Sequence, residues 1–257
     1  MMLRALLLAA VIVFPSYAVA EPSPEATSAF NDYVSQAEAR LAKQHSDAGN
    51  FLAGSFTAQE QQQLRQGELV ITGITPTNGS PLPGALLHHW RGTAFVPGAK
   101  VAGFEHLLKD LSDYPRYYAP QVLQAAVLAQ QGDHLQARLR IRQKHVITVV
   151  MDIENDIHLG RLDPQHGYSS SRSTKISEID SSGQAVAPGE DHGFLWRLNT
   201  YWSYQEADGG LYIQIESISL TRSVPAGLNW IIQPFIQKIP RESLEFTLRS
   251  TSNALKN

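Results

Sequence analysis

The sequence contains no cysteine. This absence excludes a disulfide-stapled scaffold, a thiolate metal site, a cysteine nucleophile and a lipid anchor attached through cysteine. The chain also lacks an excess of positive charge, since 21 lysines and arginines stand against 24 aspartates and glutamates and give a formal net charge of -3. Without an overall positive field to attract phosphates, we expect no nucleic-acid partner.

The common motifs of catalysis and cofactor binding are missing as well. The sequence has no G-x-S-x-G element, no glycine-rich phosphate loop and no dinucleotide-binding fingerprint. Its nine histidines are scattered, and no pair of them stands at helical spacing beside a carboxylate. We therefore expect no metal site and no cofactor, and no catalytic residue can be assigned.

Long hydrophobic runs are absent except near the start of the chain. The run at residues 5–14 follows Arg4 and is about half the roughly 20 residues that a membrane-spanning helix needs. Small residues, Ala18 and Ala20, follow at the cleavage positions of a secretory signal peptide. We predict that residues 1–20 are such a signal, cleaved after Ala20, and that the product is secreted or periplasmic. A retained membrane-anchoring segment is the alternative.

The mature chain has the composition of a soluble globular protein, with 43% hydrophobic and 18% charged residues in the full sequence. Apolar residues at helical spacing predict an amphipathic helix over 25–45. A capping box at Thr57 predicts a second, short helix over 58–66, and residues 68–72 read as a strand. The turn-rich stretch 75–84 is the best candidate boundary. Residues 21–84 are thus predicted to form a helical extension, with a short strand and a linker, before a domain at 85–257.

The second part of the chain is predicted to be rich in antiparallel strands. Residues 86–96 read as a strand and 101–111 as a helix, and the stretch 122–222 alternates repeatedly between apolar and polar residues. After it, apolar residues return to helical spacing over 226–254. Because prolines at 234 and 240 cannot donate the helical hydrogen bond, this last helix is expected to be kinked or broken.

Two adjacent alternating segments predict a hairpin. Apolar residues occupy every second position of 135–141 and of 147–153. A tight loop centred on His145 brings both apolar sets to one face and places Arg138 opposite Asp152. The arginines at 138, 140 and 142 are expected on a solvated outer face, partly neutralised by acidic residues; the alternative use of this stripe is transient contact with anionic lipid at a membrane.

The order of these elements, together with the sequence patterns given next, resembles that of the START-like helix-grip superfamily, also called the Bet v 1 or SRPBCC group. The resemblance covers 85–255 and is carried by the stretch Trp90–Pro97, the patterns Leu108-x-Asp110-x-x-x-Tyr114-Pro115 and Tyr118-x-Pro120-x-Val122, and the closing helix 226–254. It implies an α+β fold in which a curved antiparallel sheet wraps around a long C-terminal helix, with an apolar cavity between them. The superfamily includes lipid carriers, plant ligand binders and polyketide aromatases or cyclases, which share no catalytic residue.

An aromatic cluster between His192 and Tyr204 supplies most of the candidate site. Strand alternation sends Trp196 and Trp202 to one face and the polar residues between them to the other. The turn signal Asp208-Gly209 places Tyr201 opposite Glu216. Whether these groups line a cavity or are ordinary core and surface is left open by the sequence. The candidate ligand-binding residues are Tyr118, Trp196, Arg197, Asn199, Tyr201, Trp202, Glu216, Arg222, Trp230 and Phe235.

Three functions are compatible with this sequence. We favour an extracytoplasmic protein that binds a hydrophobic or amphipathic small molecule. The first alternative is a cyclase or aromatase that uses Glu216 with Tyr201 or an arginine for acid and base chemistry. The second is a cell-envelope interaction module without a ligand.

Overall fold

The computed structural model describes residues 21–54, 56–75, 79–144, 148–187, 190–223 and 229–256, and the side chains of residues 229–237 are outside this description. Residues 1–20, on which the predicted signal peptide falls, are therefore not described.

Nine strands in the described residues form one antiparallel sheet, in the order β1-β3-β9-β8-β7-β6-β5-β4, with β2 paired to β3 as well. The strand that opens the second part of the chain, β3, lies beside the last strand, β9, along its whole length. The bounds are β1 Val70–Gly73, β2 Ser80–Leu82, β3 Ala85–Pro97, β4 Val122–Gln131, β5 His134–Lys144, β6 Thr148–Asp163, β7 His166–Ile179, β8 Arg197–Ala207 and β9 Gly210–Arg222.

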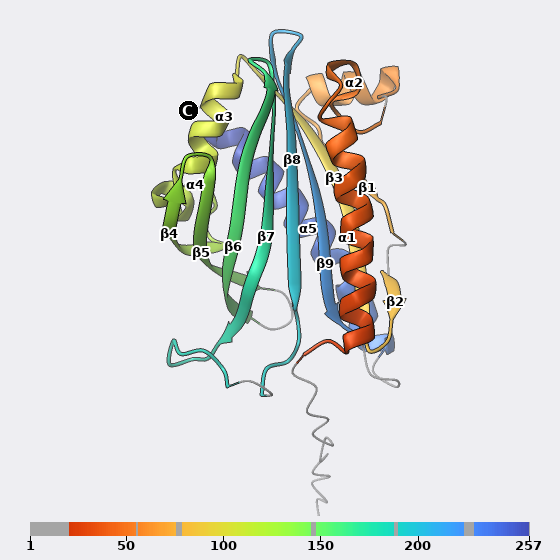
Figure 1. The fold of residues 1–257 in the computed structure, drawn as a ribbon, viewed down its shortest axis with the longest axis vertical. Coiled ribbons are helices and arrows are strands. Elements are labelled where there is room, and N and C mark those ends of the chain that lie inside the picture. The colour runs from red at the N-terminus through yellow and green to blue at the C-terminus, as the bar shows by residue number, and fades with distance from the viewer. Residues whose placement is uncertain are drawn as a thin grey trace, which may run out of the picture.

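Helices lie on both faces of this sheet (Figure 1). The long α5 packs across one face, here called the inner face, and α1 packs against the other, the outer face. The bounds of the helices are α1 Pro24–Gln44, α2 Ala58–Arg65, α3 Val101–Lys109, α4 Tyr114–Tyr117 and α5 Asn229–Ala254. The predicted helix-grip architecture is confirmed by this order of elements, with antiparallel strands followed by a long helix across the sheet.

The contact between α5 and the inner face is close and apolar. Leu244 and Leu248 of α5 belong to one buried cluster with Trp90 and Ile215 of the sheet. A side chain at Gly92 would bring its Cβ within 2.5 Å of Leu248 Cδ1, so the glycine lets the helix approach the strand. Contrary to the expected break, α5 is continuous through Pro234 and Pro240.

The outer face is covered by the predicted N-terminal helix. Ser23 caps α1, since its side chain accepts a hydrogen bond from the backbone N–H of Ala26, and Pro24 suits the first turn. The apolar stripe of α1 is buried against Leu87 of β3 and Ile218 and Leu220 of β9. The predicted linker contains β2, which pairs with β3 as β1 does. The 21–84 segment therefore adds two strands to the sheet and covers its outer face with α1.

The predicted register of the β5–β6 hairpin was wrong by two residues. Arg138 lies opposite Glu154 and Arg140 opposite Asp152, in place of Arg138 opposite Asp152. A shift of two leaves every side chain on its expected face, so the apolar pattern cannot distinguish the two registers. The observed register pairs two arginines with carboxylates and the predicted one would pair only Arg138. The predicted loop centre, His145, is outside the described residues.

Replacing Leu248 with alanine is expected to lower the free energy of unfolding by about 2–5 kcal/mol, because it empties space in a fully buried part of the core. Urea unfolding followed by circular dichroism measures the change. The matched control is Arg249→Ala at the neighbouring exposed position, which should change the value by no more than about 0.5 kcal/mol. Equal effects of the two substitutions would contradict this placement of α5.

Candidate functional site

The predicted site residue Glu216 lies on the outer face, beneath α1. Its side chain is 2% exposed. One carboxylate oxygen accepts a hydrogen bond from Arg91 Nε at 2.8 Å, and the other lies 2.7 Å from His89 Nε2 and also contacts Arg40 of α1. Tyr33, also on α1, places its hydroxyl 2.9 Å from His89 Nδ1. Two residues of α1 thus complete a polar network whose other members come from β3 and β9.

These contacts keep Glu216 ionised. Burial alone would raise the pKa of this carboxyl, but the hydrogen bond from His89 and the charges of Arg91 and Arg40 lower it to about 2. A carboxylate with this pKa does not donate a proton near neutral pH. Both of its carboxylate oxygens are also occupied, by Arg40 of α1 and by His89 and Arg91 of the sheet. We therefore assign Glu216 to the attachment of α1.

Tyr201 and Asn199 form a second polar link to α1. The Tyr201 hydroxyl donates to Glu38 Oε1 at 2.8 Å, and Asn199 Nδ2 lies 3.3 Å from the same hydroxyl. Arg172 of β7 reaches Glu38 at 2.5 Å. Burial and the nearby Glu38 carboxylate raise the pKa of Tyr201. The predicted pairing of Tyr201 opposite Glu216 is confirmed, but the two side chains bind different residues of α1.

The remaining outer-face candidates lie at the end of β8 and β9 near residues 193–197. Arg197 donates to the backbone oxygen of Trp196 at 2.8 Å, and the backbone N–H of Arg222 donates to Gly193. Trp196 is buried in the cluster around α1, whereas Trp202 is buried in the cluster around α5. The prediction that both tryptophans share one face was wrong, because β8 begins only at Arg197 and strand alternation does not extend to Trp196.

On the inner face, the end nearest α3 is filled with aromatic side chains. Trp202 and Tyr204 pack edge-on against Phe104 of α3, at ring-centroid distances of 5.2 and 4.8 Å. Tyr118, the residue after α4, packs against Tyr114 and contacts α5, with its hydroxyl 3.0 Å from Thr251 Oγ1. Burial raises the pKa of Tyr118 to about 12. This end of the interior is a packed core.

The other end of the inner face is different in character, because serine, threonine and histidine stand among its apolar residues. Strand pairing sets Ser171, Thr200, Ser217 and Trp90 in one row across the sheet. The next row contains Leu198, Ser219 and His88. No motif in the sequence marks His88 as a site residue, since a histidine in a strand carries no signal of its own.

His88 is the least satisfied polar group of this region. Its side chain is 1% exposed, and neither ring nitrogen has a hydrogen-bond partner in the part of the chain that the structure describes. Within the same described residues, the indole nitrogen of Trp90 and the hydroxyl of Thr221 also lack partners. Burial lowers the pKa of His88 to about 4, so the ring is neutral at physiological pH. Unpaired buried polar atoms are rare in folded proteins.

The structure does not test two of the candidate ligand-binding residues. Trp230 and Phe235 lie on α5, but their side chains are outside the described residues. A further group that sequence reasoning missed is His134, Asp156 and His158, which gather on the outer face of β5 and β6. Its only signal in the sequence was Asp156 and His158 two positions apart on one strand.

The helices α3 and α4 lie between β3 and β4, and the long α5 crosses an antiparallel sheet, which is the order of elements of a helix-grip fold. The fold is START-like. No protein-family model matches the chain, and no curated protein matches it in sequence.

Solved structures similar to this chain include members of the START group. A START superfamily protein from Mycobacterium smegmatis has 13% identity, with 65% of this chain and 97% of the other covered and a TM-score of 0.47. A STAR-related lipid transfer protein from Xanthomonas axonopodis has 12% identity, with 70% and 97% covered and a TM-score of 0.47. The Zhui aromatase/cyclase from Streptomyces sp. R1128 has 13% identity, with 66% and 91% covered and a TM-score of 0.46.

Replacing Glu216 with glutamine is expected to destabilise the protein and to change its response to acid. Because the pKa of Glu216 is lower in the folded state than its ordinary value of 4.5, the carboxylate stabilises the fold above pH 4.5 and loses this contribution as the pH falls toward 2. The contribution is about 3 kcal/mol at neutral pH. Urea unfolding at pH 7 and at several values below 4.5 measures it, and the variant should show the shallower pH dependence.

The control is Glu245→Gln, which removes a carboxylate paired with arginines on the surface of α5. A surface pair of this kind contributes less than about 1 kcal/mol. If Glu216→Gln matched this control at neutral pH, the buried network would not be what holds α1 to the sheet.

Proposed function

We propose that this protein is exported and binds a hydrophobic or amphipathic small molecule between the inner face of the sheet and α5. The observation that carries the proposal is His88, a neutral buried histidine whose two ring nitrogens have no partner among the described residues. A buried polar group without a hydrogen bond costs roughly 1–3 kcal/mol, and a bound molecule with a polar group would offset this cost.

The surroundings of His88 suit a molecule that is mostly apolar. Trp90 follows it by two positions on the inner face of β3, and Leu198 lies in its row beyond Ser219. Met151 and Ile153 are buried on the same face further along the sheet. Binding sites for small molecules typically combine an apolar lining with a few polar groups that fix orientation. The hydroxyl-bearing residues of the two rows described above would supply such groups beside His88.

On the outer face, the candidate polar groups Glu216 and Tyr201 are already engaged by other residues of the chain. The carboxylate is fully engaged by Arg40, His89 and Arg91, and the Tyr201 hydroxyl is engaged by Glu38. Acid and base chemistry by Glu216 and Tyr201 on a cyclising substrate would require α1 to leave the sheet. Ligand binding on the inner face would leave α1 in place, and for this reason we prefer it.

Export is part of this proposal and rests on the order of residues at the start of the chain. Arg4, the apolar run at 5–14 and the small residues at 18 and 20 follow the order of a secretory signal. No helix among the described residues has the length and hydropathy to cross a membrane. Transient contact with a membrane would involve Val127 and Leu128 on the edge strand β4, which are 44% and 47% exposed.

Filling the inner face should displace the ligand. We expect Ser171→Phe to reduce occupancy at least tenfold, because Ser171 lies on the inner face in the row of Trp90. The measurement is native mass spectrometry of the mature chain from residue 21, followed by solvent extraction of what co-purifies and titration with a fluorescent fatty acid. The matched control is Ser170→Phe, the neighbouring residue on the outer face, which should leave binding unchanged. A wild-type protein that carries nothing and binds no probe would refute the proposal.

Cleavage of the signal is expected between Ala20 and Glu21. Expression of the full chain in a Gram-negative bacterium, followed by N-terminal sequencing of the periplasmic protein, should give Glu21 as the first residue. The substitution Ala18→Asp should cause the uncleaved precursor to accumulate, because signal peptidase sites need a small residue at that position. Val19→Asp, at the intervening position, is the control. A full-length product in the cytoplasm would count against export.

A further inference from the structure

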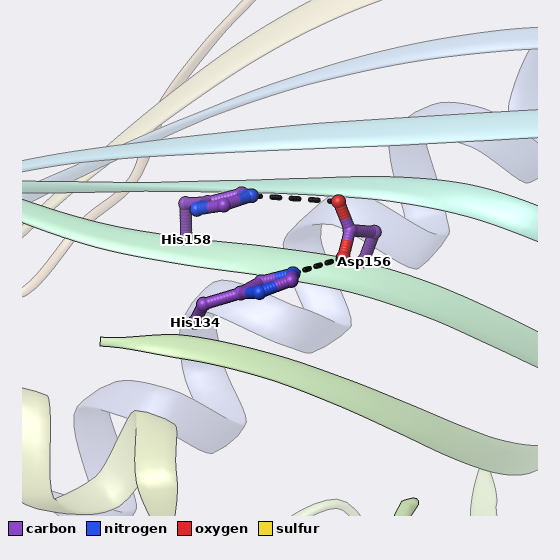
Figure 2. A group of neighbouring side chains, drawn as sticks. All are labelled: His134, Asp156 and His158. Carbon is purple, nitrogen blue, oxygen red and sulfur yellow. Dashed lines mark hydrogen bonds and ion pairs between the residues drawn. The ribbon is translucent and has the colours of Figure 1, made fainter. Parts of the chain in front are cut away.

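We propose that His134, Asp156 and His158 bind a divalent transition-metal ion, with Zn²⁺ as the leading candidate, on the outer face of β5 and β6 (Figure 2).

The position of the three residues is set by backbone pairing. His134 begins β5 and lies directly opposite His158 on the antiparallel neighbour β6. Asp156 precedes His158 by two positions, so strand alternation places it on the same face. Because all three residues belong to paired strands, their Cα positions are fixed by the hydrogen bonds of the sheet rather than by a loop.

The side chains already converge. The two imidazole rings are stacked, with centroids 4.2 Å apart and an angle of 5° between their planes. Figure 2 shows both rings directed toward the same carboxylate. His134 Nε2 forms a hydrogen bond with Asp156 Oδ1, and His158 Nε2 lies 3.4 Å from Asp156 Oδ2.

The spacing is close to what a metal ion requires. The three ligand atoms lie within 4.8 Å of one another. Ligand atoms about 2.0–2.1 Å from a tetrahedral zinc ion lie about 3.3 Å apart. The side chains of His134, Asp156 and His158 are 38%, 29% and 49% exposed, so small rotations are free to close the remaining gap.

The donor set indicates which metals fit. Two imidazole nitrogens and one carboxylate oxygen suit Zn²⁺, Ni²⁺, Co²⁺ or Cu²⁺, whereas Ca²⁺ and Mg²⁺ prefer sites made of oxygen atoms. Three protein ligands leave one tetrahedral position for water or another small ligand, as in zinc sites that are not purely structural. The partial exposure of the three side chains keeps that position accessible.

The neighbouring charges do not oppose a cation at this place. Arg172 of β7 lies in register with Asp156, but its guanidinium is paired with Glu38 of α1. On the other side, the residue opposite Asp156 is the uncharged Gln136. Arg138, which follows Gln136 by two residues on the same face of β5, is paired with Glu154. The carboxylate of Asp156 therefore remains directed at the two histidines.

The experiment uses the untagged mature chain and ZnCl₂ in isothermal titration calorimetry. We expect one ion per chain, and we expect His134→Asn, Asp156→Asn and His158→Asn each to weaken binding at least about tenfold. Titration with Co²⁺ should give visible d–d absorption that these variants lose. Circular dichroism confirms that each variant is folded.

The matched control is His192→Asn, because His192 is also hydrogen-bonded to a carboxylate, that of Glu178, but belongs to no three-residue group found in the described part of the chain. This variant should bind Zn²⁺ with unchanged affinity. The inference is overturned if the wild type shows no saturable Zn²⁺ binding, or if substitution of both His134 and His158 leaves the affinity unchanged.

Discussion

A carboxylate removed from water needs cations and hydrogen-bond donors around it, and breaking such a buried group typically costs several kcal/mol. Glu216 meets this requirement through His89 and Arg91 of β3 together with Arg40 of α1. Two of the three partners belong to the sheet, and the third arrives only with the helix. The apolar stripe of α1 would cover many surfaces of similar shape, but the charge network specifies this one. The position of α1, and with it the closure of the outer face, follows from this constraint.

Once α1 is in place, the two faces of the sheet have separate roles. The helix contacts β3, β9, β8 and β7, as the links from Arg40, Tyr33 and Glu38 show. The outer face of β5 and β6 stays in solvent, and it carries the arginine–carboxylate pairs and the group formed by His134, Asp156 and His158. The inner face is dense and aromatic beside α3 and becomes richer in hydroxyl groups toward His88. An apolar molecule with one polar end would match that gradient.

The strand and helix assignments were largely predictable, and the contacts between distant segments were not. Asp208 and Gly209 both adopt positive φ, as a two-residue hairpin turn demands, so the β8–β9 register followed from the sequence. The sequence between β5 and β6 contains no Asp-Gly or Asn-Gly pair, and the register predicted for this hairpin was wrong. Arg40 lies 176 positions from Glu216, and nothing in either local sequence indicates that they meet. Trp196 was misplaced because the predicted strand began before Arg197, where β8 begins. His88 was overlooked because burial depends on what covers a strand.

The pairing of β3 with β9 has a consequence for how the chain reaches this structure. Ala85 pairs with Arg222, so the centre of the sheet joins segments made at widely separated times during synthesis. Sheets dominated by such non-local contacts fold slowly, because a long loop must close before the pairing can form. The docking site for α1 does not exist until β9 has been synthesised. A newly made chain therefore remains without a finished sheet, and without a place for α1, until almost all of it has been synthesised.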